Sequence, residues 1–203
     1  TKLVWIETPG NPLWTVTDIA AAAEIAHAAG ARLAVDSTAA SPVHTRPLEL
    51  GADIVMHSAT KILNGHSDVV AGVLAGARAD AFWERIRGIR AGSGGILGPF
   101  EAYLLMRSLR TLHLRAAAQA AGALRLAGRL RPYWRIRREG REGLAWIDAA
   151  LRAAGPQAPP GPRAAATLGR SDLRFLTGDP EGALQASREA LALYRQAGAD
   201  AGG

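Results

Sequence analysis

Apolar residues in the first part of the chain come in short runs, and polar or turn-forming residues follow each run. The runs cover residues 3–7, 32–36, 53–57 and 69–74. Such runs are typical of strands that are buried on both faces of a parallel sheet. The alanine-rich segment 19–29 follows Thr17 and Asp18, either of which can cap it, and ends at Gly30, so it predicts a helix. This order of elements predicts an α/β fold.

The rest of the chain shows mainly helical patterns. A short helical turn is predicted over residues 47–51, and longer helices over 79–89, 99–129, 135–154, 163–177 and 180–197. Residues 90–98 form a glycine-rich loop, and the linker 155–162 contains four prolines. No strand pattern follows Tyr133. We therefore expect two domains, a truncated α/β large domain over 1–130 and a small all-α extension over 131–203.

Composition removes several classes of protein. The chain has 203 residues, of which 48% are hydrophobic and 21% charged, so it can bury a core. It contains no cysteine, which excludes a disulfide scaffold, a thiolate metal site and a cysteine nucleophile. The five histidines show no metal-ligand spacing, and we expect no metal. No apolar run reaches the ~18 residues that span a bilayer.

The N-terminus carries neither an initiator Met nor the layout of a signal peptide, and the chain reads as if it begins inside a longer domain. We expect a cytoplasmic protein with no membrane partner. The net charge of +6 comes from 22 arginines and two lysines against 18 acidic residues. Split at residue 130, the two parts carry +3 each. Nucleic-acid binding requires basic residues clustered on one face, so we expect no nucleic-acid partner.

Polar clusters follow the predicted strands, where an open parallel sheet binds its ligands. These clusters are residues 8–11, 36–38, 58–61 and 64–66. Lys61 is one of only two lysines, and an amine can attack a carbonyl whereas a guanidinium cannot. Ser58 and Thr60 offer hydroxyls to a phosphate, and Asp36 offers a carboxylate to a pyridinium nitrogen. These are the components of a pyridoxal 5'-phosphate site.

Each of these residues also has a structural interpretation. A lysine after Ser-x-Thr is commonly a solvated loop residue. An aspartate at a strand end, such as Asp36, commonly forms a turn or caps a helix, and Asn11 before Pro12 can form an Asx-turn. The residues taken alone leave both interpretations open.

Four ordered blocks of sequence resemble a known family. The blocks are Glu-Thr-Pro-Gly-Asn-Pro at 7–12, Val-Asp-Ser-Thr at 35–38, His-Ser-Ala-Thr-Lys-Ile-Leu-Asn-Gly-His-Ser-Asp-Val at 57–69, and residues 98–112. Over 1–130 they are similar to the pyridoxal-phosphate enzymes of cysteine and methionine metabolism, the trans-sulfuration enzymes such as cystathionine γ-synthase and γ-lyase. The resemblance implies part of a fold-type I (aminotransferase-like) large domain with a mostly parallel sheet. It also implies elimination or replacement at the γ carbon of an amino-acid substrate, in a homo-oligomer.

The resemblance assigns roles by position. Lys61 matches the lysine that bonds to the cofactor and moves protons, and Asp36 matches the partner of the pyridine nitrogen. Ser58 and Thr60 match the phosphate-binding hydroxyls. Asn11 matches the asparagine near the cofactor oxygen and the substrate carboxylate. The family's Asp-Asn-Thr reads Asp-Ser-Thr here. Because the family's glycine-rich segment, stacking tyrosine and substrate-binding arginine have no counterpart in this chain, we expect impaired catalysis.

The residues after 130 resemble something else. Residues 133–151 and 176–194 look like tetratricopeptide-type helical hairpins, as found in large bacterial transcriptional regulators. An unrelated helical extension explains the same pattern. The alternative function is therefore a non-catalytic interaction or regulatory protein that uses its helical tail.

Overall fold

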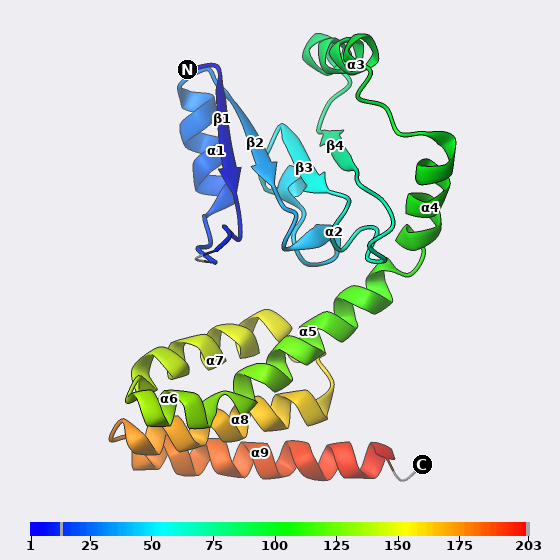
Figure 1. The fold of residues 1–203 in the computed structure, drawn as a ribbon. Coiled ribbons are helices and arrows are strands. Elements are labelled where there is room, and N and C mark those ends of the chain that lie inside the picture. The colour runs from blue at the N-terminus through cyan, green and yellow to red at the C-terminus, as the bar shows by residue number, and fades with distance from the viewer. Residues whose placement is uncertain (13, 202–203) are drawn as a thin grey trace. The chain divides into compact units, whose positions relative to one another are not determined.

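The structure is a computed structural model that describes residues 1–12 and 14–201, the last three of them by their backbone (Figure 1). The chain forms two compact units, Thr1–Ala116 and Ala117–Gly203. The division falls inside helix α5 (Leu112–Arg129). Within the described residues, no helix combines the length and the apolar character needed to cross a membrane. The second unit carries 13 arginines against eight acidic residues, so it holds most of the net charge.

A four-stranded sheet forms the centre of the first unit (Figure 1). Its strands lie in chain order, β1 (Leu3–Glu7), β2 (Arg32–Asp36), β3 (Ile54–Ser58) and β4 (Gly72–Gly76). The first three are parallel, as predicted, whereas β4 is antiparallel to β3. The two strands are joined by a loop with no crossover helix, and a parallel pair requires such a crossover. The mostly parallel α/β fold is confirmed.

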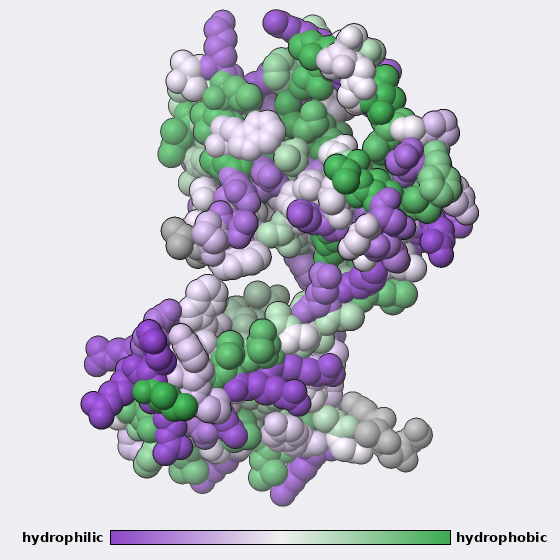
Figure 2. Space-filling model, in the orientation of Figure 1, coloured by the Kyte–Doolittle hydropathy of each residue, from purple (hydrophilic) through white to green (hydrophobic). Residues whose placement is uncertain are grey.

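Helix α1 (Ile19–Ala28) packs against β2 and begins at Asp18, whose carboxylate accepts a hydrogen bond from the Ala21 N–H at 3.0 Å. Strand β2 is buried at its centre, as predicted. The prediction that the strands are buried on both faces is wrong for β1, because its Trp5 side chain is 52% exposed and its Leu3 side chain 42% exposed. As an edge strand, β1 has sheet neighbours on one side only. Exposed apolar residues of both units are visible as green surface in Figure 2.

The helices that lie between β2 and β3, and those that follow β4, differ in length from the predicted ones. They are α2 (Ser41–His44), the 3-10 helix η1 (Pro47–Leu50), α3 (Ala81–Ser93), α4 (Pro99–Leu109) and α5. Helix α3 continues four residues into the predicted loop and ends at Gly94, which has a left-handed φ of 75°. The single helix predicted over 99–129 is two helices. The chain breaks after α4 because the Ser108 carbonyl accepts from the Thr111 N–H and the Arg115 side chain.

The second unit is entirely helical over its described residues. It contains α6 (Arg131–Arg137), α7 (Gly140–Ala154), α8 (Pro160–Leu176) and α9 (Pro180–Ala201). The helix predicted over 135–154 is interrupted at Arg138, which adopts a left-handed φ of 58°. Helix α8 begins inside the predicted linker, since proline is accepted in the first helical turn.

Close helix packing builds the core of the second unit. Helices α8 and α9 lie side by side, and the Ser171 and Ser187 hydroxyls share a hydrogen bond of 2.7 Å. The buried core residues are Leu124, Trp134, Ile147, Ala166 and Leu173. Glycines allow the closest approaches: a Cβ added at Gly143 would lie 2.6 Å from the Trp134 ring. This core therefore draws its residues from α5, α6, α7 and α8.

Candidate active site

The loops that follow β1, β2 and β3 meet at one edge of the sheet. Because these strands are parallel, Glu7 pairs with Asp36, and Asp36 with Met56. Backbone hydrogen bonds continue beyond the strand ends, since the Thr8 N–H donates to the Asp36 carbonyl at 3.1 Å. The Ser37 N–H likewise donates to the Met56 carbonyl at 3.0 Å. The backbone therefore fixes the residues that carry the candidate chemistry.

Thr38 connects Asp36 to Ser58. Its N–H and its hydroxyl both donate to Asp36 Oδ1, at 2.9 and 2.6 Å. The same hydroxyl accepts a hydrogen bond from the Ser58 N–H at 2.7 Å. The two hydrogen bonds that Thr38 donates to Asp36 go to the same carboxylate oxygen, Oδ1. Asp36 Oδ2 therefore stays available to accept from a ligand.

Lys61 lies in a tight turn directly after β3. Its N–H donates to the Ser58 carbonyl at 3.0 Å, and its carbonyl accepts from the Gly65 N–H at 2.7 Å. The side chain is exposed and has no ion-pair partner in the described part of the chain. Its amine is therefore accessible, in a turn that also connects to Asp36 through Ser58 and Thr38.

Thr60 and Asn11 stand apart from this group. The Thr60 hydroxyl accepts from the Ala71 N–H at 2.9 Å and donates to the Ala71 carbonyl at 3.3 Å. To bind a phosphate, Thr60 has to redirect its proton while keeping the first of these bonds. Asn11 is exposed, and its N–H lies 3.4 Å from the Glu7 carboxylate. The described contacts join Asp36, Ser58 and Lys61, but they do not bring Asn11 to them.

A second set of residues contacts the turn that carries Lys61. Its main member, Arg115, was not predicted from the sequence. Arg115 donates from Nη1 to the Ile62 carbonyl and from Nη2 to the Leu63 carbonyl at 3.0 Å. Asn64 is fully buried and donates to Asp68 Oδ1 at 2.6 Å. Arg115 is more than fifty residues from Lys61. No local pattern could have shown this contact.

His57 is a buried histidine on β3, next to Ser58. Burial lowers the pKa of its imidazole below the usual value. Its interactions with the Ser37 backbone and the charge of Asp36 raise the pKa by a smaller amount. Its Nδ1 atom is buried without a hydrogen-bond partner in the described structure. Burial therefore favours the neutral form of this imidazole in the folded state.

A pH dependence follows from this shift. The unfolded state binds a proton at His57 near pH 6.5, whereas the folded state resists it. The contribution to the free energy of unfolding is thus present above that pH and is lost as the pH falls toward the folded pKa. We expect wild type to lose more stability than His57→Gln between about pH 7.5 and 5.5. Urea denaturation at both pH values measures this, and equal losses would contradict it.

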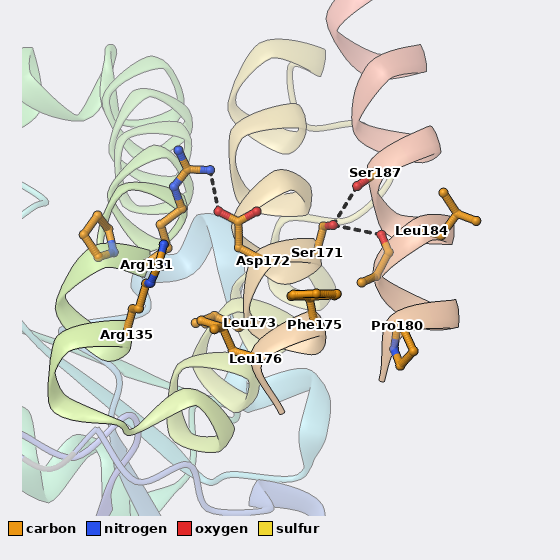
Figure 3. Close-up of a pocket in the computed structure, with 12 residues that line it drawn as sticks. Arg131, Arg135, Ser171, Asp172, Leu173, Phe175, Leu176, Pro180, Leu184 and Ser187 are labelled. Carbon is orange, nitrogen blue, oxygen red and sulfur yellow. Dashed lines mark hydrogen bonds and ion pairs between the residues drawn. The ribbon is translucent and has the colours of Figure 1, made fainter. Parts of the chain in front are cut away.

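The helical unit contains a separate groove of about 670 Å³ (Figure 3). Phe175, Leu176 and Leu184 form part of its apolar lining, and Arg131 pairs with Asp172 at 2.9 Å across one wall. It contains none of the candidate residues named above.

Comparison with known proteins decides the family. Residues 1–137 match the model of the Cys/Met metabolism PLP-dependent enzymes. The chain belongs to this family. It is 46% identical over 138 residues to a cystathionine γ-lyase of Dictyostelium discoideum, covering 68% of this chain and 35% of that protein. It is also 46% identical over 127 residues to a cystathionine γ-synthase of Mycobacterium tuberculosis, covering 63% of this chain and 32% of that protein.

Solved structures of Cys/Met metabolism enzymes agree with this family assignment. A methionine γ-lyase of Micromonospora echinospora, CalE6, superposes with a TM-score of 0.58 at 43% identity. The match covers 63% of this chain and 35% of that chain. The chain thus spans about a third of the length of the relatives it matches. The family model ends within α6, so these comparisons assign no family to the remaining helices.

The cofactor of this PLP-dependent family, pyridoxal 5'-phosphate, suits the groups at the sheet edge. A carboxylate with an available oxygen and a half-buried hydroxyl lie at the ends of β2 and β3, at Asp36 and Ser58, and the turn after β3 carries an accessible amine at Lys61. They match the aldehyde, the pyridine nitrogen and the phosphate in chemical type. Thr60 fits only after its proton is redirected.

Proposed function

We propose that this chain provides part of the cofactor site of an enzyme that eliminates or replaces the γ-substituent of a sulfur amino acid or a homoserine ester. The joining of Asp36, Ser58 and Lys61 by Thr38 and the backbone carries the proposal. Its context is a family match over residues 1–137. Relatives are named as lyases and a synthase acting on cystathionine or methionine, which supports a sulfur amino acid as substrate.

Each residue has an assigned role in this proposal. Lys61 Nζ bonds to the cofactor and carries protons between substrate carbons, and Asp36 Oδ2 accepts from the protonated ring nitrogen. The hydroxyls of Ser58 and Thr60 donate to the phosphate, and Asn11 donates to the ring oxygen and the substrate carboxylate. When bound, pyridoxal phosphate supplies an aldehyde that condenses with an amine and a ring that takes up the electrons of a carbanion.

Four further predictions belong to the proposal. The family match supports a homo-oligomer and a cytoplasmic site of action. The division into a large domain over 1–130 and an extension over 131–203 is supported by the family match, which ends at residue 137. The pairing of α8 with α9 across a Gly-Asp turn supports a tetratricopeptide-type repeat.

Covalent trapping tests the proposal. The chain is mixed with pyridoxal phosphate and reduced with borohydride, and the modified peptides are identified by mass spectrometry. Only Lys2, Lys61 and the terminal amine can react. We expect preferential modification of Lys61, which Lys61→Ala removes and the matched control Lys2→Ala leaves intact. Equal modification of Lys2 and Lys61 contradicts the proposal.

That negative outcome would favour the second candidate function, a non-catalytic interaction protein. The observation behind it is the groove of the helical unit, in which exposed Phe175 and Leu184 lie beside arginines. Positive trapping would instead justify assays of γ-substituted amino acids, which separate lyase from synthase activity.

A further inference from the structure

A single guanidinium, that of Arg115, binds the turn that carries Lys61. Arg115, in α5, donates to the carbonyls of Ile62 and Leu63, the two residues after Lys61. It also donates to the carbonyl of Ser108 at 2.9 Å, in the last turn of α4. One side chain thus binds three carbonyls on two segments that are more than forty residues apart.

The Ile62 and Leu63 carbonyls need a hydrogen-bond donor. Residues 59–64 form a single turn, and a turn that does not continue leaves its last carbonyls without backbone donors. At the end of α4, the Ser108 carbonyl already accepts from the N–H and the hydroxyl of Thr111, and Arg115 adds a charged donor. A guanidinium has five N–H donors in a fixed fork and no acceptor, and its positive charge suits the negative end of a helical turn. Arg115 donates to the Lys61 turn and to the end of α4 at once.

Neighbouring residues are arranged around this contact. Asn64 Oδ1 accepts from the Ser108 hydroxyl at 3.3 Å, and the Asn64 carbonyl lies 2.6 Å from His66 Nδ1. Since a carbonyl only accepts, that nitrogen carries the proton. Gly65 has a φ of 72°, and a Cβ there would collide with the guanidinium of Arg115. The turn therefore has little freedom to move while Arg115 is in place.

We propose that Arg115 is the positioning residue of the active site: it fixes the backbone of the 59–65 turn and thereby the place from which the Lys61 amine reacts. The inference rests on the proposed function of Lys61, but it also makes a claim about the turn that can be tested without cofactor. Arg115 touches no reacting atom in this proposal.

Hydrogen exchange tests the claim about the turn. In Arg115→Met, the amides of Asn64 and Gly65, which bond to the Ala59 and Lys61 carbonyls, should exchange about tenfold faster or more. The amides of β2 should keep their wild-type rates. The matched control is Arg110→Met, which removes an exposed arginine one turn away. Unchanged exchange in the turn overturns the proposal, and so does an equal increase throughout the unit.

Trapping with pyridoxal phosphate and borohydride gives the second readout. Arg115→Met should lower the ratio of modified Lys61 to modified Lys2, whereas Arg110→Met should preserve the wild-type ratio. A wild-type ratio in Arg115→Met overturns the inference alone. Absence of any Lys61 preference in wild type refutes the proposed function, and the exchange rates still decide whether Arg115 holds the turn. If Arg115→Met does not fold, Arg115→Gln, which keeps two amide donors, takes its place.

Discussion

Replacing Gly128 with alanine is expected to destabilise the helical unit by about 3 kcal/mol or more. Gly128 lies in α5 where the helix meets the backbone of α8. An added Cβ would lie 2.6 Å from the Ala165 carbonyl carbon and 2.8 Å from the Ala166 nitrogen. Both are backbone atoms that cannot rotate away, so the two helices would have to separate. The reciprocal contact is also tight, since a Cβ at Gly169 would lie 3.2 Å from Gly128 Cα.

Gly122→Ala is the matched control for this effect. Gly122 is in the same helix, and its Cβ would meet no atom within 4 Å. Alanine there should stabilise the helix by about 0.5–1 kcal/mol, because glycine loses more backbone entropy on folding. Urea denaturation followed by far-UV circular dichroism measures both changes. Equal stability of the two variants would show that α5 and α8 do not pack as closely as described.

Gly65→Ala should be the most damaging small substitution near Lys61. Alanine at a left-handed φ costs about 1–2 kcal/mol by itself. Its Cβ would also displace Nη1 of Arg115 from the Ile62 carbonyl, and the loss of that charge-assisted hydrogen bond costs about 1.5–3 kcal/mol. We expect a total loss of about 3–5 kcal/mol in the free energy of unfolding.

Gly30→Ala separates the two causes. Gly30 has a φ of 69°, close to that of Gly65, but its Cβ would meet no atom within 4 Å. It should lose only the backbone cost, about 1–2 kcal/mol. Chemical denaturation of both variants gives the difference that belongs to Arg115. If Gly30→Ala and Gly65→Ala lose the same stability, the guanidinium contributes nothing to holding the turn.

Elements set by local chemistry were predictable. Strands β1 and β2 match their apolar runs residue for residue, and the carboxylate of Asp18 caps α1 as its position indicated. The convergence of Asp36, Ser58 and Lys61 followed from the order of parallel strands, because the carboxyl ends of such strands share one edge. Hydrogen bonds through Thr38 join Asp36 and Ser58, the last residues of the adjacent strands β2 and β3.

Features set by distant residues were not predictable from local pattern. The apolar run 69–74 was placed as a strand, but Val70 is 87% exposed and β4 begins at Gly72, because Ala71 is bound to Thr60. The break between α4 and α5 depends on a carbonyl shared with Arg115. Both differences come from contacts between segments far apart in sequence, which periodicity does not encode.

The Ser37 N–H bonded to the Met56 carbonyl bears on how members of this family are recognised in genomes. Position 37 contributes its backbone, and its side chain is fully buried with a hydroxyl that has no partner in the described structure. Space therefore limits this position more strictly than chemistry does. A motif search that demands the amide of Asp-Asn-Thr passes over this chain, whereas one that accepts any small polar residue between aspartate and threonine finds it.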